Sequence, residues 1–168
     1  MKLETERIVI KALTAEELEN FIQAIELKAN YEDIVVSDNL KNKDAAYLLK
    51  EVLLKKVYQK PTMYCYNTFW LIYDKENKKQ LGQYCFNAPP NAEGLAEIYF
   101  EIYQDDQNKG YMTEALIKIL EWCKGTGKIK KVKTIIENFN VAAEKLLKNM
   151  GFEKEPETNY MSRWIKSI

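Results

Sequence analysis

Two hydrophobic periodicities alternate along the chain, one typical of strands and the other typical of helices. In residues 96–103 (AEIYFEIY), Ile98, Phe100 and Ile102 share one face of an extended segment. Glu97, Tyr99 and Glu101 share the other face, and such alternation predicts a strand. Further strands are predicted at 7–13, 68–74, 80–87 and 131–136, and residues 152–165 can supply two more around Pro156.

Apolar residues at helical spacing predict four helices, at 15–25, 44–59, 109–124 and 140–150. The first helix begins with a capping box, in which Thr14 and Glu17 satisfy each other's backbone amides. Pro61 prevents continuation of the second helix, and Gly151 stops the fourth. We expect residues 45, 48, 49, 52, 53 and 57 of the second helix to face the core.

The predicted element order is β-α-α-β-β-β-α-β-α-β-β, without repeats or composition breaks. Consecutive strands in the first half favour antiparallel pairing, and alternating strands and helices in the second half favour a parallel crossover. We therefore predict one domain over residues 1–168, of α/β (α+β) class, with a mixed, mostly antiparallel sheet of about seven strands.

Composition narrows the possible chemistry. The sequence has no histidine, which excludes Ser-His-Asp triads, Cys-His dyads and His-rich zinc sites, and no metal is expected. Lys+Arg and Asp+Glu both number 25, so nothing indicates binding to nucleic acid or to an anionic membrane. The three unpaired cysteines, the lack of a signal peptide and the lack of a long apolar run make the cytoplasm the expected location.

The segment from Ile102 to Ala115 has the pattern of an anion site. A strand ends, a polar loop follows, and a helix opens at Gly110. The first amides of a helix lack internal partners and carry partial positive charge, so they suit a pyrophosphate, to which Lys109 adds a cation. Asp105 and Asp106 would repel a phosphate, and we expect both to point outward. The Walker A and Rossmann glycine patterns are absent.

Four stretches of the sequence resemble the GNAT superfamily of N-acetyltransferases, closest to its branch of ribosomal-protein N-terminal acetyltransferases (RimJ/RimL-like). These stretches follow the order and spacing of the family. The first is LETERIVI at 3–10, and the second is WLIY at 70–73 together with Leu81-Gly82. The third is AEIYFEI at 96–102 together with QNKGYMTEA at 107–115, and the fourth runs from Asn140 to Met150-Gly151-Phe152. The resemblance implies helices on both faces of the sheet. It also implies that strands four and five are parallel and splay apart.

The resemblance further implies acetyl-CoA (coenzyme A) as co-substrate. Amides of the loop would hold its pyrophosphate, the edge of the strand ending at Ile102 would pair with the pantetheine arm, and Asn140 would bind that arm from the other side. The implied cofactor-binding residues are Phe100, Glu101, Ile102, Gln107, Asn108, Lys109, Gly110, Tyr111, Met112, Thr113, Asn140 and Ala143. Met112 stands where the family has a small residue, and Asn108 where the branch often has glycine.

Acetyl transfer to an amine requires a group that removes the amine proton. Glu97 is the candidate catalytic base by position, and Glu137 is a reserve candidate. The proton donors usual in the family are replaced by Ala143 and Leu147, which leaves tyrosines 99, 111 and 160 or water as donors.

The expected activity is transfer of an acetyl group, by direct attack in a ternary complex, to a primary amine. The amine acceptor is a small molecule or a protein N-terminus, and the enzyme is a monomer or a homodimer. The alternative is a catalytically weak or inactive acyl-CoA-binding module, because both usual proton donors are missing.

Overall fold

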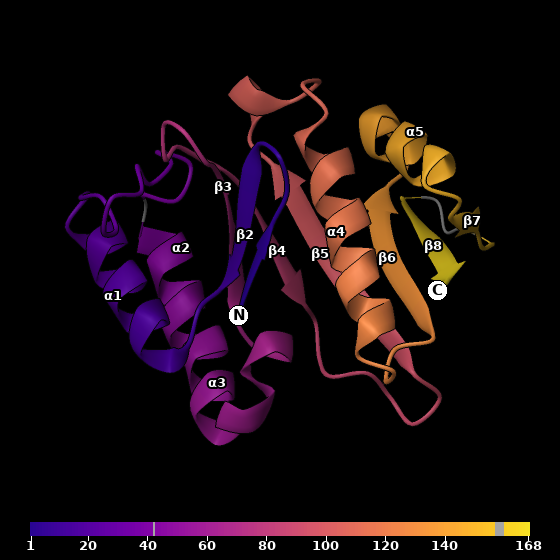
Figure 1. The fold of residues 1–168 in the computed structure, drawn as a ribbon, viewed down its shortest axis with the longest axis horizontal. Coiled ribbons are helices and arrows are strands. Elements are labelled where there is room, and N and C mark those ends of the chain that lie inside the picture. The colour runs from indigo at the N-terminus through magenta and orange to yellow at the C-terminus, as the bar shows by residue number, and fades with distance from the viewer. Residues whose placement is uncertain (42, 157–159) are drawn as a thin grey trace.

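The computed structural model describes residues 1–41, 43–156 and 160–168. Its centre is an eight-stranded sheet in the order β1-β2-β3-β4-β5-β6-β8-β7 (Figure 1). The strands are β1 (Lys2–Glu4), β2 (Ile8–Ala12), β3 (Phe69–Asp74), β4 (Gln80–Phe86), β5 (Leu95–Ile102), β6 (Lys131–Glu137), β7 (Glu153–Lys154) and β8 (Met161–Ser167). The predicted final segment includes residues 157–159, which lie outside the described residues.

Six helical elements and two short 3₁₀ turns accompany the sheet in the described part of the chain. They are α1 (Ala15–Glu26), α2 (Lys43–Leu48), a π-helical segment (Leu49–Leu54), α3 (Lys55–Gln59), a 3₁₀ turn (Pro61–Tyr66), a second 3₁₀ turn (Gln104–Asp106), α4 (Tyr111–Gly125) and α5 (Val141–Asn149). The capping box at the start of α1 is confirmed, since Thr14 N donates to Glu17 Oε2 at 2.8 Å and Glu17 N donates to Thr14 Oγ1 at 3.3 Å.

Alternate residues of β2 enter different hydrophobic clusters, so both faces of the sheet are covered. Ile8 and Ile10 pack in a cluster that also contains the inner side chains of α4 and Leu147 of α5. Val9 packs in the second cluster, with the inner side chains of α1 and with Ala46. The helices α1, α2 and α3 lie toward the β2 end of the sheet, and α4 and α5 lie toward the β6 end (Figure 1). The expected mixed fold, with helices on both faces, is confirmed.

The splayed pair of strands is also present. β5 and β6 are parallel, and their pairing runs from Leu95↔Lys131 to Ile98↔Thr134. Beyond that point β5 continues to pair only with β4, up to Ile102, while β6 continues to pair with β8, up to Glu137. Because each strand keeps its outer neighbour, the second halves of β5 and β6 diverge and leave a gap in the sheet.

Two local features differ from the sequence-based expectation. β1 is an additional edge strand, too short to show a periodicity. The predicted helix at 44–59 contains a π-helical segment, whose wider turn rotates the side chains that follow. Leu48 and Val52, expected in the core, are instead 57% and 38% exposed, whereas Ala46 is buried. None of the helices in the described part of the chain has the length and apolar character needed to cross a bilayer.

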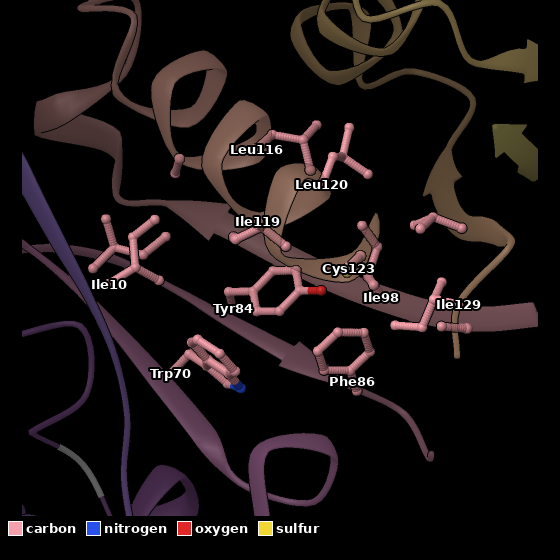
Figure 2. Close-up of a cluster of buried hydrophobic side chains, with 14 of the residues drawn as sticks. Ile10, Trp70, Tyr84, Phe86, Ile98, Leu116, Ile119, Leu120, Cys123 and Ile129 are labelled. Carbon is pink, nitrogen blue, oxygen red and sulfur yellow. The ribbon is translucent and has the colours of Figure 1, made fainter. Parts of the chain in front are cut away.

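Tyr84 is fully buried beneath α4, among Trp70, Phe86 and Cys123 (Figure 2). Its hydroxyl has no hydrogen-bond partner among the described residues, and burial raises its pKa well above the ordinary value. An unpaired buried hydroxyl costs about 1–3 kcal/mol, so Tyr84→Phe should leave stability unchanged or raise it by about 1 kcal/mol. Urea denaturation measures this change.

Tyr103→Phe is the matched control for that substitution. Tyr103 is also buried, but its hydroxyl accepts a hydrogen bond from Gln80 Nε2 at 2.9 Å. Its removal leaves a buried amide donor unpaired and should cost about 1–3 kcal/mol. Equal losses of stability in Tyr84→Phe and Tyr103→Phe would contradict the assignment of the Tyr84 hydroxyl as an unpaired group in the core.

Candidate functional site

A cavity of about 590 Å³ opens where β5 and β6 diverge, beside the starts of α4 and α5. Side chains from both faces of the sheet line it, because the gap passes between the two strands. Of the residues predicted from sequence, these line the cavity: Phe100, Glu101, Ile102, Gln107, Asn108, Gly110, Tyr111, Met112, Thr113, Asn140 and Ala143. Glu97 and Lys109 are not among its lining residues.

The start of α4 forms one end of the cavity and has no side-chain cap. The residue before the helix, Gly110, has a φ of 82°, and Asn108 has a φ of 62°, so both adopt the left-handed conformation. The first helical hydrogen bond runs from Glu114 N to Gly110 O at 3.1 Å. The amides of residues 111–113 consequently have no partner within the helix.

This open helix start contrasts with those of α1 and α5. Thr14 caps α1, and the Asn140 side chain caps α5 by accepting from Ala143 N at 3.0 Å. Amides left uncapped beside a cavity, at the positive end of a helix of 15 residues, are suited to bind an anion. Met112, which stands where the family has a small residue, packs in part against the hydrophobic core.

Both aspartates before the loop were expected to point outward, and this is confirmed for Asp105 and wrong for Asp106. Asp105 is exposed, whereas Asp106 is 4% exposed and lines the cavity. The Asp106 carboxylate binds Lys79 Nζ at 2.5 Å and Lys109 Nζ at 2.9 Å. Burial opposes its ionisation, but the hydrogen bonds from both lysines outweigh burial and lower its pKa. Asp106 thus holds the loop inward. It also pairs with the Lys109 ammonium, which we expected to bind a phosphate.

Asn140 and the first turn of α5 lie across the cavity from the α4 loop. Asn140, Ala142 and Ala143 line this side, and Ala143 also packs against the core. Leu147, at a position where the family often has a proton-donating tyrosine, is completely buried. The first turn of α5 therefore offers the cavity a polar amide side chain and a small apolar surface.

Glu97, the candidate base, lies in the part of β5 that still pairs with β6. Its register partner is Lys133, whose Nζ lies 2.5 Å from Glu97 Oε2. Asn87 Nδ2 donates to the other carboxylate oxygen at 3.3 Å. The strands diverge one residue beyond this pair, so the structure does not bring Glu97 to the cavity.

Glu101 lies four residues further along the same face of β5 and does line the cavity. Its Oε2 accepts from Gln83 Nε2 at 2.9 Å and from the Tyr99 hydroxyl at 3.2 Å. Burial, and then the negative charge of Glu101, raise the pKa of Tyr99 to about 12. Tyr99 therefore remains a neutral hydrogen-bond donor to the carboxylate at physiological pH.

The β6 side of the cavity was missed by sequence reasoning, apart from Glu137. Thr134, Ile135 and Ile136 line the cavity together with Glu137. The alternation in this strand was visible, but nothing in it marks where pairing with β5 ends. Of the three candidate proton donors, Tyr99 and Tyr111 line the cavity, whereas Tyr160 is 78% exposed and does not.

Comparison with solved structures shows the same fold in known acetyltransferases. A putative ribosomal-protein-serine acetyltransferase from Vibrio cholerae matches with a TM-score of 0.69 and 16% identity, covering 100% of this chain and 98% of the other. The ribosomal alpha-N-protein acetyltransferase RimL, in complex with coenzyme A, matches with a TM-score of 0.71 and 16% identity, covering 100% and 98%. At this identity the likeness establishes the fold alone.

Sequence comparison gives shorter matches and a family. The uncharacterized N-acetyltransferase YjdG of Bacillus subtilis (strain 168) is 27% identical over 96 residues, which is 57% of this chain and 57% of the relative. The uncharacterized N-acetyltransferase p20 of Bacillus licheniformis is 28% identical over 81 residues, 48% and 46% of the two chains. The matches thus span about half the length of these relatives. The family profile of the acetyltransferase (GNAT) domain matches residues 7–153, and the chain belongs to this family.

Proposed function

We propose that the protein is an acetyl-CoA-dependent N-acetyltransferase that acts on a primary amine. The observation that carries this proposal is the position of the uncapped start of α4 at one end of the cavity between the splayed strands. In one cavity, backbone amides can bind an anion and an unpaired strand edge can form hydrogen bonds with a chain that contains amides. Coenzyme A has both parts, a pyrophosphate and a pantetheine arm.

The residues fit such a donor. Backbone amides between Gln107 and Met112 would bind the pyrophosphate. The backbone edge of residues 99–101, beyond the end of pairing with β6, would pair with the amides of the pantetheine arm, as a strand pairs with its neighbour, whereas Ile102 O already accepts a hydrogen bond from Gln107 Nε2 at 3.0 Å. Asn140 would contact the arm from the α5 side. The cavity volume, about 590 Å³, lies within the range of roughly 300–1,000 Å³ typical of small-molecule sites.

Acetyl-CoA would supply the activated acetyl group, and the protein would supply a base for the acceptor amine. We assign this role to Glu101 in place of Glu97, because Glu101 lines the cavity and the Glu97 carboxylate is paired with Lys133. Tyr99 and Gln83 donate to one oxygen of Glu101, which fixes the carboxylate and leaves its second oxygen for the amine proton.

A proton donor for the departing thiolate is not required. A thiol has a pKa of about 8.5, so its thiolate is a weak base that leaves readily. Tyr99, with a pKa of about 12, holds its proton more tightly than a thiol does, which disfavours it as the acid. Tyr99 instead serves to orient Glu101, and the replacement of the usual donors by Ala143 and Leu147 is compatible with turnover.

The acceptor would approach over the face of the sheet that bears Glu101. Tyr99 on β5 and Ile135 on β6, both at the cavity, are 49% and 37% exposed on this side. The structural neighbours include enzymes named for the acetylation of ribosomal proteins. Protein N-termini are therefore the first acceptors to test, followed by small primary amines.

Two measurements on the purified protein test this proposal. Calorimetric titration with acetyl-CoA should show saturable binding, and a thiol-reactive dye should report coenzyme A release with at least one N-terminal peptide or small amine. Absence of binding would overturn the proposal. Binding without thiol release across peptides and amines would instead support the non-catalytic acyl-CoA-binding module.

A further inference from the structure

The turn between β1 and β2 packs against the start of α4, although more than 100 residues separate them in the sequence. Glu114, in the first turn of α4, accepts hydrogen bonds from the Thr5 hydroxyl and from Arg7 N, the latter at 3.1 Å. The Arg7 guanidinium also pairs with Glu114, with Nε and Nη2 at 2.7 and 2.6 Å from Oε2. Burial opposes ionisation of Glu114, but the bonds from Thr5 and Arg7 outweigh it and lower the pKa of this carboxyl.

The same guanidinium contacts the loop that precedes α4. Arg7 Nη1 donates to the carbonyl oxygen of Lys109 at 3.1 Å. Arg7 Cζ lies 4.7 Å from the centre of the Tyr111 ring, and a side chain at Gly110 would meet Nη2 at 3.5 Å. One arginine thus contacts Lys109 of the loop, the ring of Tyr111 and the carboxylate of Glu114 in the first turn of the helix.

The contact with Lys109 O determines the direction of one amide. In a trans peptide the carbonyl and the following N–H point in opposite directions, and the peptide between Lys109 and Gly110 is trans. A carbonyl held toward Arg7 therefore directs the Gly110 N–H away from Arg7. Gly110 lines the cavity, whereas Arg7 does not.

Two further restraints act on the same loop. The side chain of Lys109 is held by Asp106 Oδ1 and by the carbonyl of Asp105, at 2.9 and 2.8 Å. The left-handed conformations of Asn108 and Gly110 turn the backbone between them. Because the Lys109 side chain is held on one side and the Lys109 carbonyl on the other, the 109–110 peptide has little freedom to rotate.

We propose that Arg7 is a positioning residue for the donor site: it orients the 109–110 peptide so that the Gly110 amide is preset for the pyrophosphate. This inference rests on the proposed function. Arg7 acts through the backbone of the loop and does not bind the donor itself. Preorganised amides cost no reordering when the anion binds, so loss of Arg7 weakens affinity for donors that carry a pyrophosphate.

The test compares a donor with a pyrophosphate and one without it. Arg7→Met should weaken coenzyme A binding about tenfold in calorimetry, the scale of one charge-assisted hydrogen bond. It should raise the KM for acetyl-CoA similarly without lowering kcat, and leave kcat/KM for acetyl-pantetheine within about twofold. Arg7→Lys keeps the charge but not the planar fork, so it should resemble Arg7→Met.

Lys55→Met is the control, because it removes an exposed ion pair, with Glu51 at 2.6 Å, from a helix that does not line the cavity. Unchanged coenzyme A affinity in Arg7→Met would overturn the inference and leave the proposed function intact. Equal losses with acetyl-CoA and acetyl-pantetheine would also overturn it, as would full recovery in Arg7→Lys. A wild-type protein that does not bind coenzyme A would remove the proposed function itself.

Discussion

Replacement of Glu101 by glutamine is expected to lower kcat about 100-fold to 1,000-fold, within the range for loss of a general base. Glutamine preserves the shape of the side chain and can still accept the hydrogen bond from Tyr99. It has no basic oxygen for the amine proton. The Kd for acetyl-CoA should change less than about twofold, since the proposed donor contacts at this position are made by the backbone.

Glu97→Gln is the comparison that separates the two candidate bases. Glu97 lies on the same face of the same strand, but Lys133 engages it in the paired part of the sheet. Its loss should cost less than about threefold in kcat, since an ion pair of this kind contributes about 1 kcal/mol or less. The assignment fails if Glu97→Gln loses the larger share of activity, because the base would then act from the paired end of β5.

Increasing pH should partly restore the activity of Glu101→Gln. A primary amine must lose a proton before it attacks, and a larger fraction is neutral at higher pH even without an enzymatic base. A pH–rate profile between pH 7 and about pH 10 measures this recovery. A variant whose deficit is the same at every pH would have lost something other than proton removal.

The two glutamates of β5, Glu97 and Glu101, show which features the sequence can predict and which it cannot. Alternation in residues 96–103 placed Glu97 and Glu101 correctly on one face of β5. Which of them reaches the cavity depends on where pairing with β6 ends. That point, Ile98↔Thr134, is set by the three-dimensional divergence of two strands that each keep another neighbour. Periodicity within one strand contains no information about it.

Asp106 illustrates a second kind of limit. It was expected to point outward because its negative charge would repel the phosphate expected nearby. Its burial depends on Lys79, which lies 27 residues earlier in the chain. By contrast, the capping box at Thr14 and the helix start at Gly110 were predictable, because each follows from a few adjacent residues.

Gly82→Ala should be the most damaging of the conservative substitutions for the fold around the site. A Cβ at Gly82 would lie 2.1 Å from the carbonyl oxygen of Glu101 and 3.0 Å from Ile102 Cα. Both of these atoms belong to the backbone of β5, so no side-chain rotation relieves the clash. We expect a loss of about 1–3 kcal/mol, the cost of overpacking a well-packed region, with a Tm lower by about 2–4 °C per kcal/mol.

Gly125→Ala provides the matched control, because a Cβ there has nothing within 4 Å and Gly125 ends α4 without a positive φ. This variant should be stabilised by about 0.4–1 kcal/mol through reduced entropy of the unfolded chain. Calorimetry of both variants separates a specific contact from a general effect of losing glycine. A Gly82→Ala protein as stable as Gly125→Ala would contradict the close approach of β4 to β5.

Gly82→Ala should affect activity more than it affects stability. To admit the methyl group, β4 and β5 must separate at the residue that carries the proposed base and borders the splayed edge. The hydrogen bond from Gln83 to Glu101, which spans the same two strands, would lengthen or break. A displacement of about 1 Å can cost about 100-fold in rate. The close approach of β4 to β5 at Gly82 holds the Glu101 carboxylate where the amine arrives. Folded Gly82→Ala protein, assayed well below its Tm, should therefore have a reduced kcat, whereas Gly125→Ala should keep the wild-type kcat.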